Sequence, residues 1–277
     1  MAIPNIKSFS DLHYLAESFR LGSTDYKDFL RTTFAWFDED DHGYFGQIQK
    51  PKLQATLDDI AAALELISDE EVFPPLQQAM LPLSTAPDNL NSPAANELKA
   101  FHIKRPPIHQ YDWYKEEDCL YIIPASFLEE ATALVNIARH PQHPNNIKFH
   151  GCRVRRGHIT GLIFDEYKDN LRDWLSKGQL VNDAVFMDQL ESAVCHLHSL
   201  GLAHNDINPA KIMIEEQSGQ PILVDFGSCH KIGDDLTASR GTPGWTEVGD
   251  DYTKSKKSHD LYALDKIRIW LSNPIRE

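Results

Sequence analysis

The chain has 277 residues and a formal net charge of −14, and 42% of its residues are hydrophobic. This length and composition are ordinary for a globular protein with one large domain or two small ones, and they exclude disorder throughout. The acidic balance, without a long basic run, argues against a general nucleic-acid binder, because binding to the phosphate backbone depends on clustered Lys and Arg.

No targeting or membrane-spanning segment is recognisable in the sequence. Residues 1–19 lack a basic stretch followed by an apolar one, and no stretch approaches about 18 apolar residues in a row. The cysteines form no CxxC pair, which favours reduced thiols over a disulfide framework or a zinc site. We therefore expect a cytoplasmic protein that does not bind a membrane.

The N-terminal part, residues 1–81, is predicted to be a helical extension. Apolar residues recur at helix-type spacing over 9–67, which predicts three helices. Residues 34–49 look like a degenerate calcium-binding EF-hand loop, but Gln49 stands where such loops have a bidentate carboxylate. The residues in matching positions are Asp38, Asp40, His42 and Gly43. We interpret the segment as an acidic turn between two helices.

The texture of the sequence changes after residue 81. Residues 82–97 are rich in Pro, Ser, Asn and Ala without an apolar period, and we interpret them as a linker. Beyond this linker, alternation of residue types predicts a strand over 98–106, and helical spacing predicts a helix over 127–140. Residues 147–167 are typical of two strands joined by a tight turn at Gly157.

A long helix is predicted over 183–200, where apolar residues recur at helical spacing. Gly201 follows it directly, which is the position where glycine most often ends a helix. The buried stripe of this helix is predicted to consist of Val185, Leu190, Val194 and Leu197.

The most specific signal follows this helix. It consists of "HNDINPAKIMI" at 204–214, a short turn, and the apolar strand "PILVDFG" at 221–227. Asp206 and Asp225 are 19 residues apart, and a hairpin between them would point both carboxylates into one cleft. One acid could accept the proton of a hydroxyl group while the other holds Mg²⁺ against the phosphates of a nucleotide.

On these residues the chain resembles the protein-kinase superfamily, and most closely the fungal kinase-like proteins that carry "HNDINP" and "GTPGWT" blocks. The second block stands at 241–246. The resemblance implies an α+β, bilobal kinase-like fold that follows the helical extension. Its N-lobe would span 98–167, and a truncated C-lobe would span 168–277.

The resemblance also implies roles for individual residues. Asp206 would be the catalytic base, and Asp225 would bind Mg²⁺. Lys104 would contact the α- and β-phosphates of ATP, with Glu130 preferred over Glu129 as its partner. Alternatively, Lys104 would be an exposed lysine of an edge strand. A hinge whose backbone pairs with adenine would lie at Asp165, Glu166 and Tyr167.

Support for the loop around Asp206 is expected from two further residues. His204 would brace this loop from the inside. A helix over 258–271 would carry Asp260, whose carboxylate would accept hydrogen bonds from the backbone near His204. Alternatively, Asp260 would simply cap its own helix.

Two departures from the family pattern bear on catalysis. No glycine occurs from Gln47 to His150, so the glycine-rich loop that lets backbone N–H groups approach phosphate is missing. Lys211 stands where the family has a metal-binding asparagine, and an ammonium group has no lone pair for Mg²⁺. Asn208 stands where Ser/Thr kinases carry a phosphate-contacting lysine, so the two residues look exchanged. Lys211 would then supply charge to the phosphates while Asp225 alone holds one Mg²⁺. Alternatively, metal binding has simply been lost, or Lys211 turns to the solvent.

The sequence thus predicts an ATP-dependent kinase-like phosphotransferase that acts on a hydroxyl group of a protein substrate. Asp206, Lys211 and Asn208 are its candidate catalytic residues. A pseudokinase that serves as a binding or scaffold module and a small-molecule kinase stay open as alternatives. The expected cofactors are ATP and Mg²⁺, and the expected partners are a nucleotide and a protein or small-molecule hydroxyl acceptor, with neither nucleic acid nor membrane.

Overall fold

The computed structural model describes residues 4, 6–20, 26–77, 85–91, 100–237, 240–247 and 251–272. No helix in these ranges is long and apolar enough to cross a membrane. The chain divides into two compact units, and each is built from three separate segments. Unit 1 comprises Met1–Leu76, Arg105–Phe127 and Val154–Gly161, and unit 2 comprises Gln77–Lys104, Leu128–Arg153 and Leu162–Glu277. The predicted domain boundaries at 81, 97 and 167 stay predictions.

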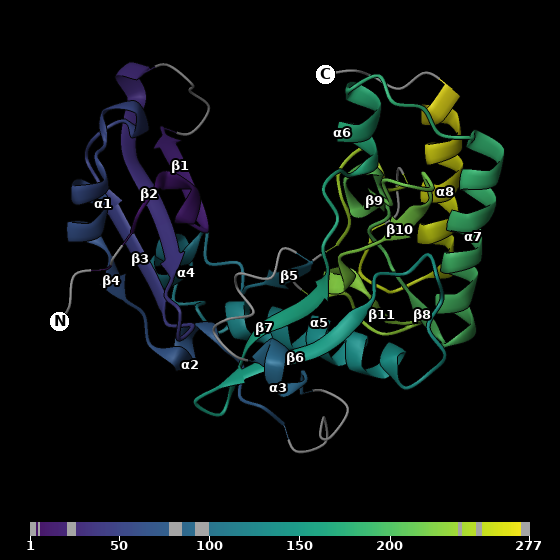
Figure 1. Ribbon diagram of the computed structural model, residues 1–277, viewed down its shortest axis with the longest axis horizontal. Helices are drawn as coiled ribbons and strands as arrows, with labels where there is room; N and C mark the ends of the chain where they lie inside the picture. The colour runs from purple at the N-terminus through teal and green to yellow at the C-terminus, as the bar shows by residue number, and fades with distance from the viewer. Residues whose placement is uncertain are drawn as a thin grey trace. The chain divides into compact units, whose positions relative to one another are not determined.

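Helices and strands are mixed along the chain (Figure 1). The helices are α1 (Leu57–Ala63), α2 (Asp69–Val72), α3 (Asp88–Asn91), α4 (Tyr111–Glu116), α5 (Ile122–Ala138), α6 (Leu171–Ser176), α7 (Asp183–Ser199) and α8 (Lys257–Ser272). The strands are β1 (Tyr14–Phe19), β2 (Phe29–Phe37), β3 (Gly43–Ile48), β4 (Glu65–Leu66), β5 (Phe101–Lys104), β6 (Phe149–Arg155), β7 (His158–Asp165), β8 (Leu202–Ala203), β9 (Ile212–Ile214), β10 (Pro221–Leu223) and β11 (His230–Lys231).

Four antiparallel strands form the sheet of unit 1, in the order β1-β2-β3-β4. Successive side chains of β2 point to opposite faces of the sheet. Phe34 packs with Ile60 of α1 on one face, whereas Ala35 joins a cluster with Val72 of α2 on the other. At Gly46 of β3, an added Cβ would lie 2.6 Å from the backbone of α1. The close approach of α1 to the sheet therefore requires glycine at this position.

This sheet corrects the prediction of a helical N-terminal extension. Residues 14–19, 29–37 and 43–48 are strands, and α1 is the only α-helix among the described residues of 9–67. Because β2 is covered on both faces, its apolar residues do not alternate cleanly with polar ones. The spacing of its aromatic residues therefore imitated a helix, although aromatic and β-branched residues favour strands.

The acidic segment 38–42 forms the turn between β2 and β3, and not a turn between helices. The Asp38 carboxylate accepts hydrogen bonds from the backbone N–H groups of Asp40 and His42, at 3.0 and 2.8 Å. Nowhere in the described ranges do three or more His, Cys, Asp or Glu side chains gather as they would around a metal ion. The resemblance to a calcium-binding loop thus reflects a self-bonded hairpin turn.

Asp41 is the buried member of this turn. Its side chain is fully buried, and its backbone adopts a positive φ of 66°. The Arg105 guanidinium donates a hydrogen bond to its Oδ1 at 2.7 Å, and the Thr160 hydroxyl donates one to Oδ2 at 2.8 Å. A charge buried in this way is stable only with such partners, so Asp41 ties the three segments of unit 1 together.

The predicted linker over 82–97 lies largely outside the described residues. Within its described part, 85–91, the backbone N–H of Ala86 donates a hydrogen bond to the carbonyl of Cys152 in β6, at 2.9 Å. Leu90 of α3 is buried against Ile163 of β7. This part is therefore packed onto unit 2.

A three-stranded sheet in the order β5-β7-β6 carries one side of the candidate site. β5 falls within the strand predicted over 98–106, and α5 contains most of the helix predicted over 127–140. β6 and β7 are joined by Arg156 and Gly157, with φ values of 50° and 79°. Two consecutive positive φ values are typical of a tight two-residue hairpin. The predicted turn at Gly157 is therefore confirmed.

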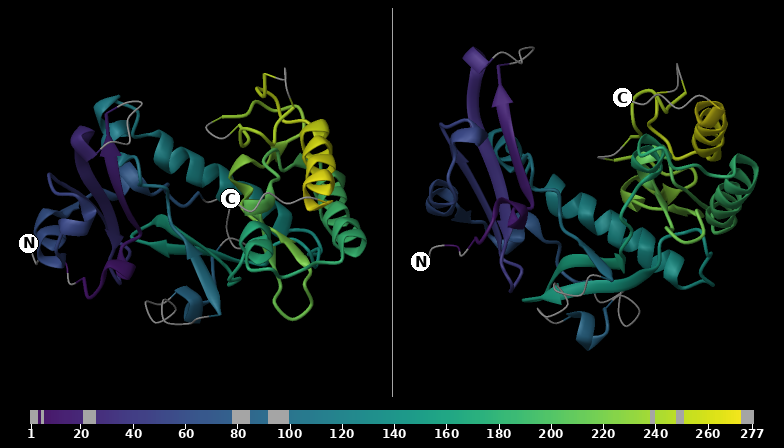
Figure 2. Two further views of the ribbon diagram at one scale, coloured as in Figure 1. Left: turned by 90° about the horizontal axis from the view of Figure 1, so that it is seen from above. Right: turned by 45° about the horizontal axis from the view of Figure 1, so that its top comes forward.

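α7 and α8 lie side by side in unit 2 (Figures 1 and 2). The predicted buried stripe of α7 is confirmed at Leu190, Val194 and Leu197, which are fully buried. It is wrong at Val185, whose side chain is 51% exposed. Val185 lies five residues before Leu190, which places it about 140° away around the helix. Gly201 follows α7 with a φ of 76°, as predicted for the residue that ends it.

We expect Asp41→Asn to destabilise unit 1 by about 3 kcal/mol, because the substitution leaves the buried Arg105 guanidinium without its carboxylate. Hydrogen-exchange mass spectrometry of peptides from β2 and β3 measures this loss as faster exchange. Asp40→Asn is the matched control, since the Asp40 side chain is exposed in the same turn. Equal exchange in the two variants would mean that the ion pair does not hold the turn.

Candidate functional site

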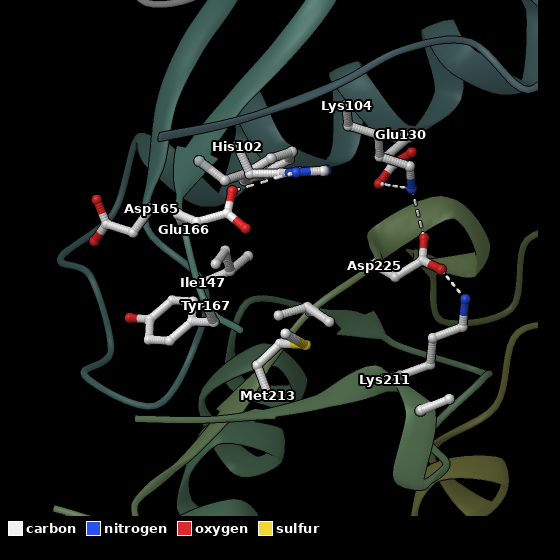
Figure 3. Close-up of a pocket in the computed structure, with 13 residues that line it drawn as sticks. His102, Lys104, Glu130, Ile147, Asp165, Glu166, Tyr167, Lys211, Met213 and Asp225 are labelled. Atoms are coloured by element: carbon white, nitrogen blue, oxygen red, sulfur yellow. Dashed lines mark hydrogen bonds and ion pairs between the residues drawn. The ribbon is translucent and has the colours of Figure 1, made fainter. Parts of the chain in front are cut away.

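A cavity of about 350 Å³ lies within unit 2. This volume is within the usual range of small-molecule sites, about 300–1,000 Å³. Its lining residues are His102, Lys104, Glu130, Ile147, Phe164, Asp165, Glu166, Tyr167, Ala210, Lys211, Met213, Val224 and Asp225. Figure 3 shows a charged cluster at one end, the segment 165–167 at the other, and Ile147 and Met213 between them. The cavity therefore joins an apolar middle to a charged end.

The charged end brings together four residues from separate elements, which we call the charged cluster: Lys104, Glu130, Asp225 and Lys211. Lys104 is the last residue of β5, and its Nζ donates hydrogen bonds to Glu130 Oε1 at 2.8 Å and to Asp225 Oδ1 at 2.7 Å. Lys211 ends the 3₁₀ turn Pro209–Lys211 and donates to Asp225 Oδ2. Both oxygens of Asp225 thus accept a hydrogen bond from an ammonium group.

The electrostatic environment of the cluster favours the charged forms of Lys104 and Asp225. Burial alone would lower the pKa of Lys104, but the carboxylates of Glu130 and Asp225 hold that pKa above its ordinary value. Burial would raise the pKa of Asp225, but the two ammonium groups hold it well below its ordinary value. Burial raises the pKa of Glu130, and Lys104 opposes this effect only in part. Lys104 and Asp225 are therefore charged at neutral pH.

α5 turns Glu130, rather than Glu129, toward Lys104. Glu130 is 4% exposed and faces the cavity. Glu129 points elsewhere: it accepts a hydrogen bond from the Thr237 hydroxyl and lies 3.7 Å from His230. The structure thus places Glu130, and not Glu129, beside Lys104, and the role of this pair in binding ATP stays a prediction.

The predicted hinge residues Asp165, Glu166 and Tyr167 all line the cavity. Two of their backbone N–H groups are already used, because Asp165 donates to the carbonyl of Lys148 at 3.3 Å and Glu166 to that of Ala100 at 3.0 Å. None of the described residues accepts a hydrogen bond from the N–H of Tyr167. Of the three, Tyr167 therefore has the N–H donor that a ligand could use.

Asp206 and Asn208 form a second group, which does not line the cavity. Asp206 Oδ1 accepts hydrogen bonds from the Thr242 hydroxyl at 2.6 Å and from the Asn208 amide at 3.3 Å. Asn208 also caps the 3₁₀ turn that follows, since its Oδ1 accepts from the backbone N–H of Ala210 at 3.0 Å. Of the three predicted catalytic residues, Lys211 alone lines the cavity, and Asn208 is used to shape the loop.

Asp260 of α8 holds the loop that carries Asp206. Its buried carboxylate accepts hydrogen bonds from the backbone N–H groups of His204, at 2.9 Å, and Asn205, at 2.7 Å. The His204 ring is also fully buried and lies 3.1 Å from the carbonyl oxygen of Val224. The predicted contact between Asp260 and the backbone near His204 is therefore confirmed.

Sequence reasoning missed Asn205 and Thr242. Asn205 has a φ of 63°, and its amide donates to Ala203 O and Ser228 O, both at 2.9 Å, and to Ser255 Oγ at 3.0 Å. Asparagine is one of the few residue types that adopt this left-handed conformation readily, which was the available signal. Nothing in the local sequence indicated that Thr242 would reach Asp206, because 36 residues separate them.

The chemistry of these donors does not fit a bound Mg²⁺ ion. Mg²⁺ requires nearly octahedral coordination by oxygen atoms. Asp225 is the predicted ligand, yet both of its oxygens accept hydrogen bonds from lysines, and Lys211 offers no lone pair. Asn208, the amide nearest to Lys211 in the sequence, is bonded to Asp206 and Thr242. The role of Asp225 as a metal ligand stays a prediction that this arrangement does not support.

Comparison with known proteins gives a consistent family match. The protein kinase domain model matches residues 110–269, which is more than half of the chain. The serine/threonine-protein kinase/endoribonuclease IRE1 of Hypocrea jecorina is 28% identical over 139 residues, which cover 43% of this chain and 11% of the relative. Death-associated protein kinase 2 of Mus musculus is 30% identical over 124 residues, or 42% of this chain and 33% of the relative. The chain thus spans only a minor part of these relatives.

Among solved structures, the kinase PK-1 of the Cydia pomonella granulovirus matches with a TM-score of 0.43 and 20% sequence identity. The match covers 51% of this chain and 53% of the viral one. The family match, together with the mixed helices and strands, confirms the predicted α+β, bilobal kinase-like fold. The closer resemblance to fungal kinase-like proteins stays a prediction.

We expect Asp260→Asn to destabilise the loop 202–209 by about 2 kcal/mol, because an amide nitrogen would face one of the two N–H groups that the carboxylate now accepts. Hydrogen exchange of this loop and the melting temperature of the protein measure the loss. Asp265→Asn on the same helix is the control, since its side chain is 73% exposed. A loop that exchanges equally fast in both variants would show that Asp260 does not hold it.

Proposed function

Because the chain belongs to the protein kinase domain family, we propose that it transfers the γ-phosphoryl group of ATP to a hydroxyl group of a protein substrate. The observation that carries this proposal is the 2.8 Å ion pair between Lys104 and Glu130 at the charged end of the cavity. This pair is the feature by which the family orients a lysine toward the phosphates of ATP.

The cavity suits ATP along its length. Its apolar middle offers surfaces on which an adenine ring can pack, contributed by Ala210, Ile147, Phe164, Met213 and Val224. The N–H of Tyr167, from which no described residue accepts a hydrogen bond, offers a donor to the base. Lys104 and Lys211 offer positive charge to the phosphates at the other end.

Asp206 is the proposed base. Thr242 and Asn208 both donate to its Oδ1, and no hydrogen-bond donor within the described ranges contacts its Oδ2. In the transfer step, Oδ2 accepts the proton of the substrate hydroxyl while the hydroxyl oxygen bonds to the γ-phosphorus. The bond from that phosphorus to the β–γ bridging oxygen breaks, and ADP leaves with the electron pair. The hydrogen bonds to Oδ1 fix the orientation of the carboxylate.

A second candidate function is that of a pseudokinase that serves as a binding or scaffold module, in the form that binds nucleotide without transferring phosphate. The specific observation in its favour is the Asp225 carboxylate, whose oxygens accept hydrogen bonds from Lys104 and Lys211. The two functions agree on nucleotide binding and differ only in turnover.

We expect Asp206→Asn to lower phosphoryl transfer from ATP by at least about 100-fold, because the amide cannot accept the hydroxyl proton. ATP affinity should change by less than about threefold, since Asp206 does not line the cavity. Transfer is measured with radiolabelled ATP on casein and on a mixed library of serine and threonine peptides, and affinity by calorimetry.

Asp188→Asn is the matched control, because Asp188 is exposed on α7, and it should keep full activity. ATP binding without transfer in the unmodified chain would support the pseudokinase. Absence of any ATP binding would contradict both candidate functions.

A further inference from the structure

The charged cluster has a feature that the proposed transfer does not use. Asp225 accepts hydrogen bonds from two ammonium groups, that of Lys104 on Oδ1 and that of Lys211 on Oδ2 (Figure 3). Lys104 is also paired with Glu130 at 2.8 Å. The cluster thus contains two amino groups and two carboxyl groups, and an ammonium group already lies at each oxygen of Asp225.

A divalent cation has no favourable place in this arrangement. To bind Asp225 it would have to displace the ammonium of Lys104 or Lys211, or remain beside both and be repelled by them. Among the described residues, Asp225 belongs to no group of three or more His, Cys, Asp or Glu side chains that could hold a metal ion. Lys211 therefore places a single positive charge at Asp225 Oδ2, an oxygen atom that would otherwise be available to a metal ion.

The same two lysines keep donors for a ligand. An ammonium group has three N–H bonds. Lys104 donates two of them, to Glu130 and Asp225, and so has one N–H without an acceptor among the described residues. Lys211 donates one, to Asp225, and has two without such an acceptor. Both side chains line the cavity. An anionic oxygen that enters its charged end therefore meets ammonium donors directly.

The sequence upstream supports the same conclusion independently. No glycine occurs from Gln47 to His150. A loop whose backbone N–H groups approach phosphate closely depends on glycine. Charge compensation for phosphates in this cavity must therefore come from side chains, and the cavity-lining side chains that carry positive charge at its charged end are Lys104 and Lys211.

We propose that this cavity binds the polyphosphate chain of a nucleotide without a divalent cation, with the Lys211 ammonium, beside that of Lys104, neutralising the phosphates directly. Asp225 is then the counterion of the two lysines in the absence of a ligand, and not a metal ligand. This inference rests on the proposed function for the identity of the ligand as ATP. It also means that ATP binding does not require Mg²⁺, which the family generally uses together with ATP.

The test is calorimetric titration of the full chain with ATP in excess EDTA and, separately, in excess MgCl₂. We expect the two dissociation constants to agree within about threefold. A dissociation constant more than about tenfold weaker in EDTA overturns the inference but leaves the proposed function standing. Lack of binding in both buffers overturns the inference together with the proposed function.

Two variants sharpen the test, because the proposed roles of Lys211 and Asp225 predict opposite changes in ATP affinity when each residue is replaced. Lys211→Asn removes the charge and restores the amide of the family, so ATP affinity in EDTA should fall about tenfold and MgCl₂ should recover part of it. Asp225→Asn removes the anion that competes with phosphate for both lysines, so affinity in EDTA should rise. If Asp225 were a metal ligand, the same substitution would instead abolish Mg²⁺-dependent binding.

Lys177→Asn is the control for loss of one positive charge, since the Lys177 side chain is 57% exposed and lies outside the cavity-lining residues. Its ATP affinity should be unchanged in both buffers. Melting temperatures measured without nucleotide identify a variant that fails to fold. If Lys211→Asn fails to fold, the ATP affinity of Asp225→Asn in EDTA still tests the proposal. An unchanged EDTA affinity in folded Lys211→Asn overturns the inference.

Discussion

The carboxylate of Asp225 is the interaction on which the candidate site depends. It joins the end of β5, through Lys104, to the 3₁₀ turn that carries Lys211. Lys104 in turn reaches Glu130 on α5, so one carboxylate and one ammonium connect four separate parts of the chain. Removing either group would leave a partly buried charge without its partner, which is the costly way to break such a pair.

A second carboxylate, Asp260, has a different task. It is fully buried and accepts two backbone N–H groups from the loop that precedes Asp206. Once these N–H groups are buried, water cannot accept their hydrogen bonds, so the loop depends on Asp260 of α8 for its shape. Asp225 thus holds charged side chains together, whereas Asp260 holds the backbone of the loop.

The sequence contained enough information for the elements whose pattern is set locally. Gly157 marked a hairpin because its turn needs positive φ, and Leu190, Val194 and Leu197 marked α7 because they share one helical face. It failed at β2, where burial on both faces removed the alternation by which strands are recognised. Such burial depends on α1 and α2, which a local pattern does not contain.

The sequence allowed the prediction of those site residues whose type and motif position indicate a role. Lys104 was expected to pair with Glu130, and the structure contains this pair. The bond from Lys104 to Asp225 was not expected, because Asp225 had been assigned to Mg²⁺. The bond between Thr242 and Asp206 was not expected, because it joins segments 36 residues apart without a shared pattern. The separation of Asp206 from the cavity lining was also missed, since spacing along the chain does not tell which cavity a side chain faces.

The discontinuity of unit 1 has a consequence for how the protein is made. Asp41 is held by Arg105 and Thr160, which lie 64 and 119 residues later in the chain. A ribosome that has released only the N-terminal sheet has therefore not yet supplied the partners of its buried charge. Unit 1 cannot be completed before residue 161 emerges, by which time parts of unit 2 have already been synthesised. The two units must fold in an interleaved order, and contacts between such distant segments make folding slow.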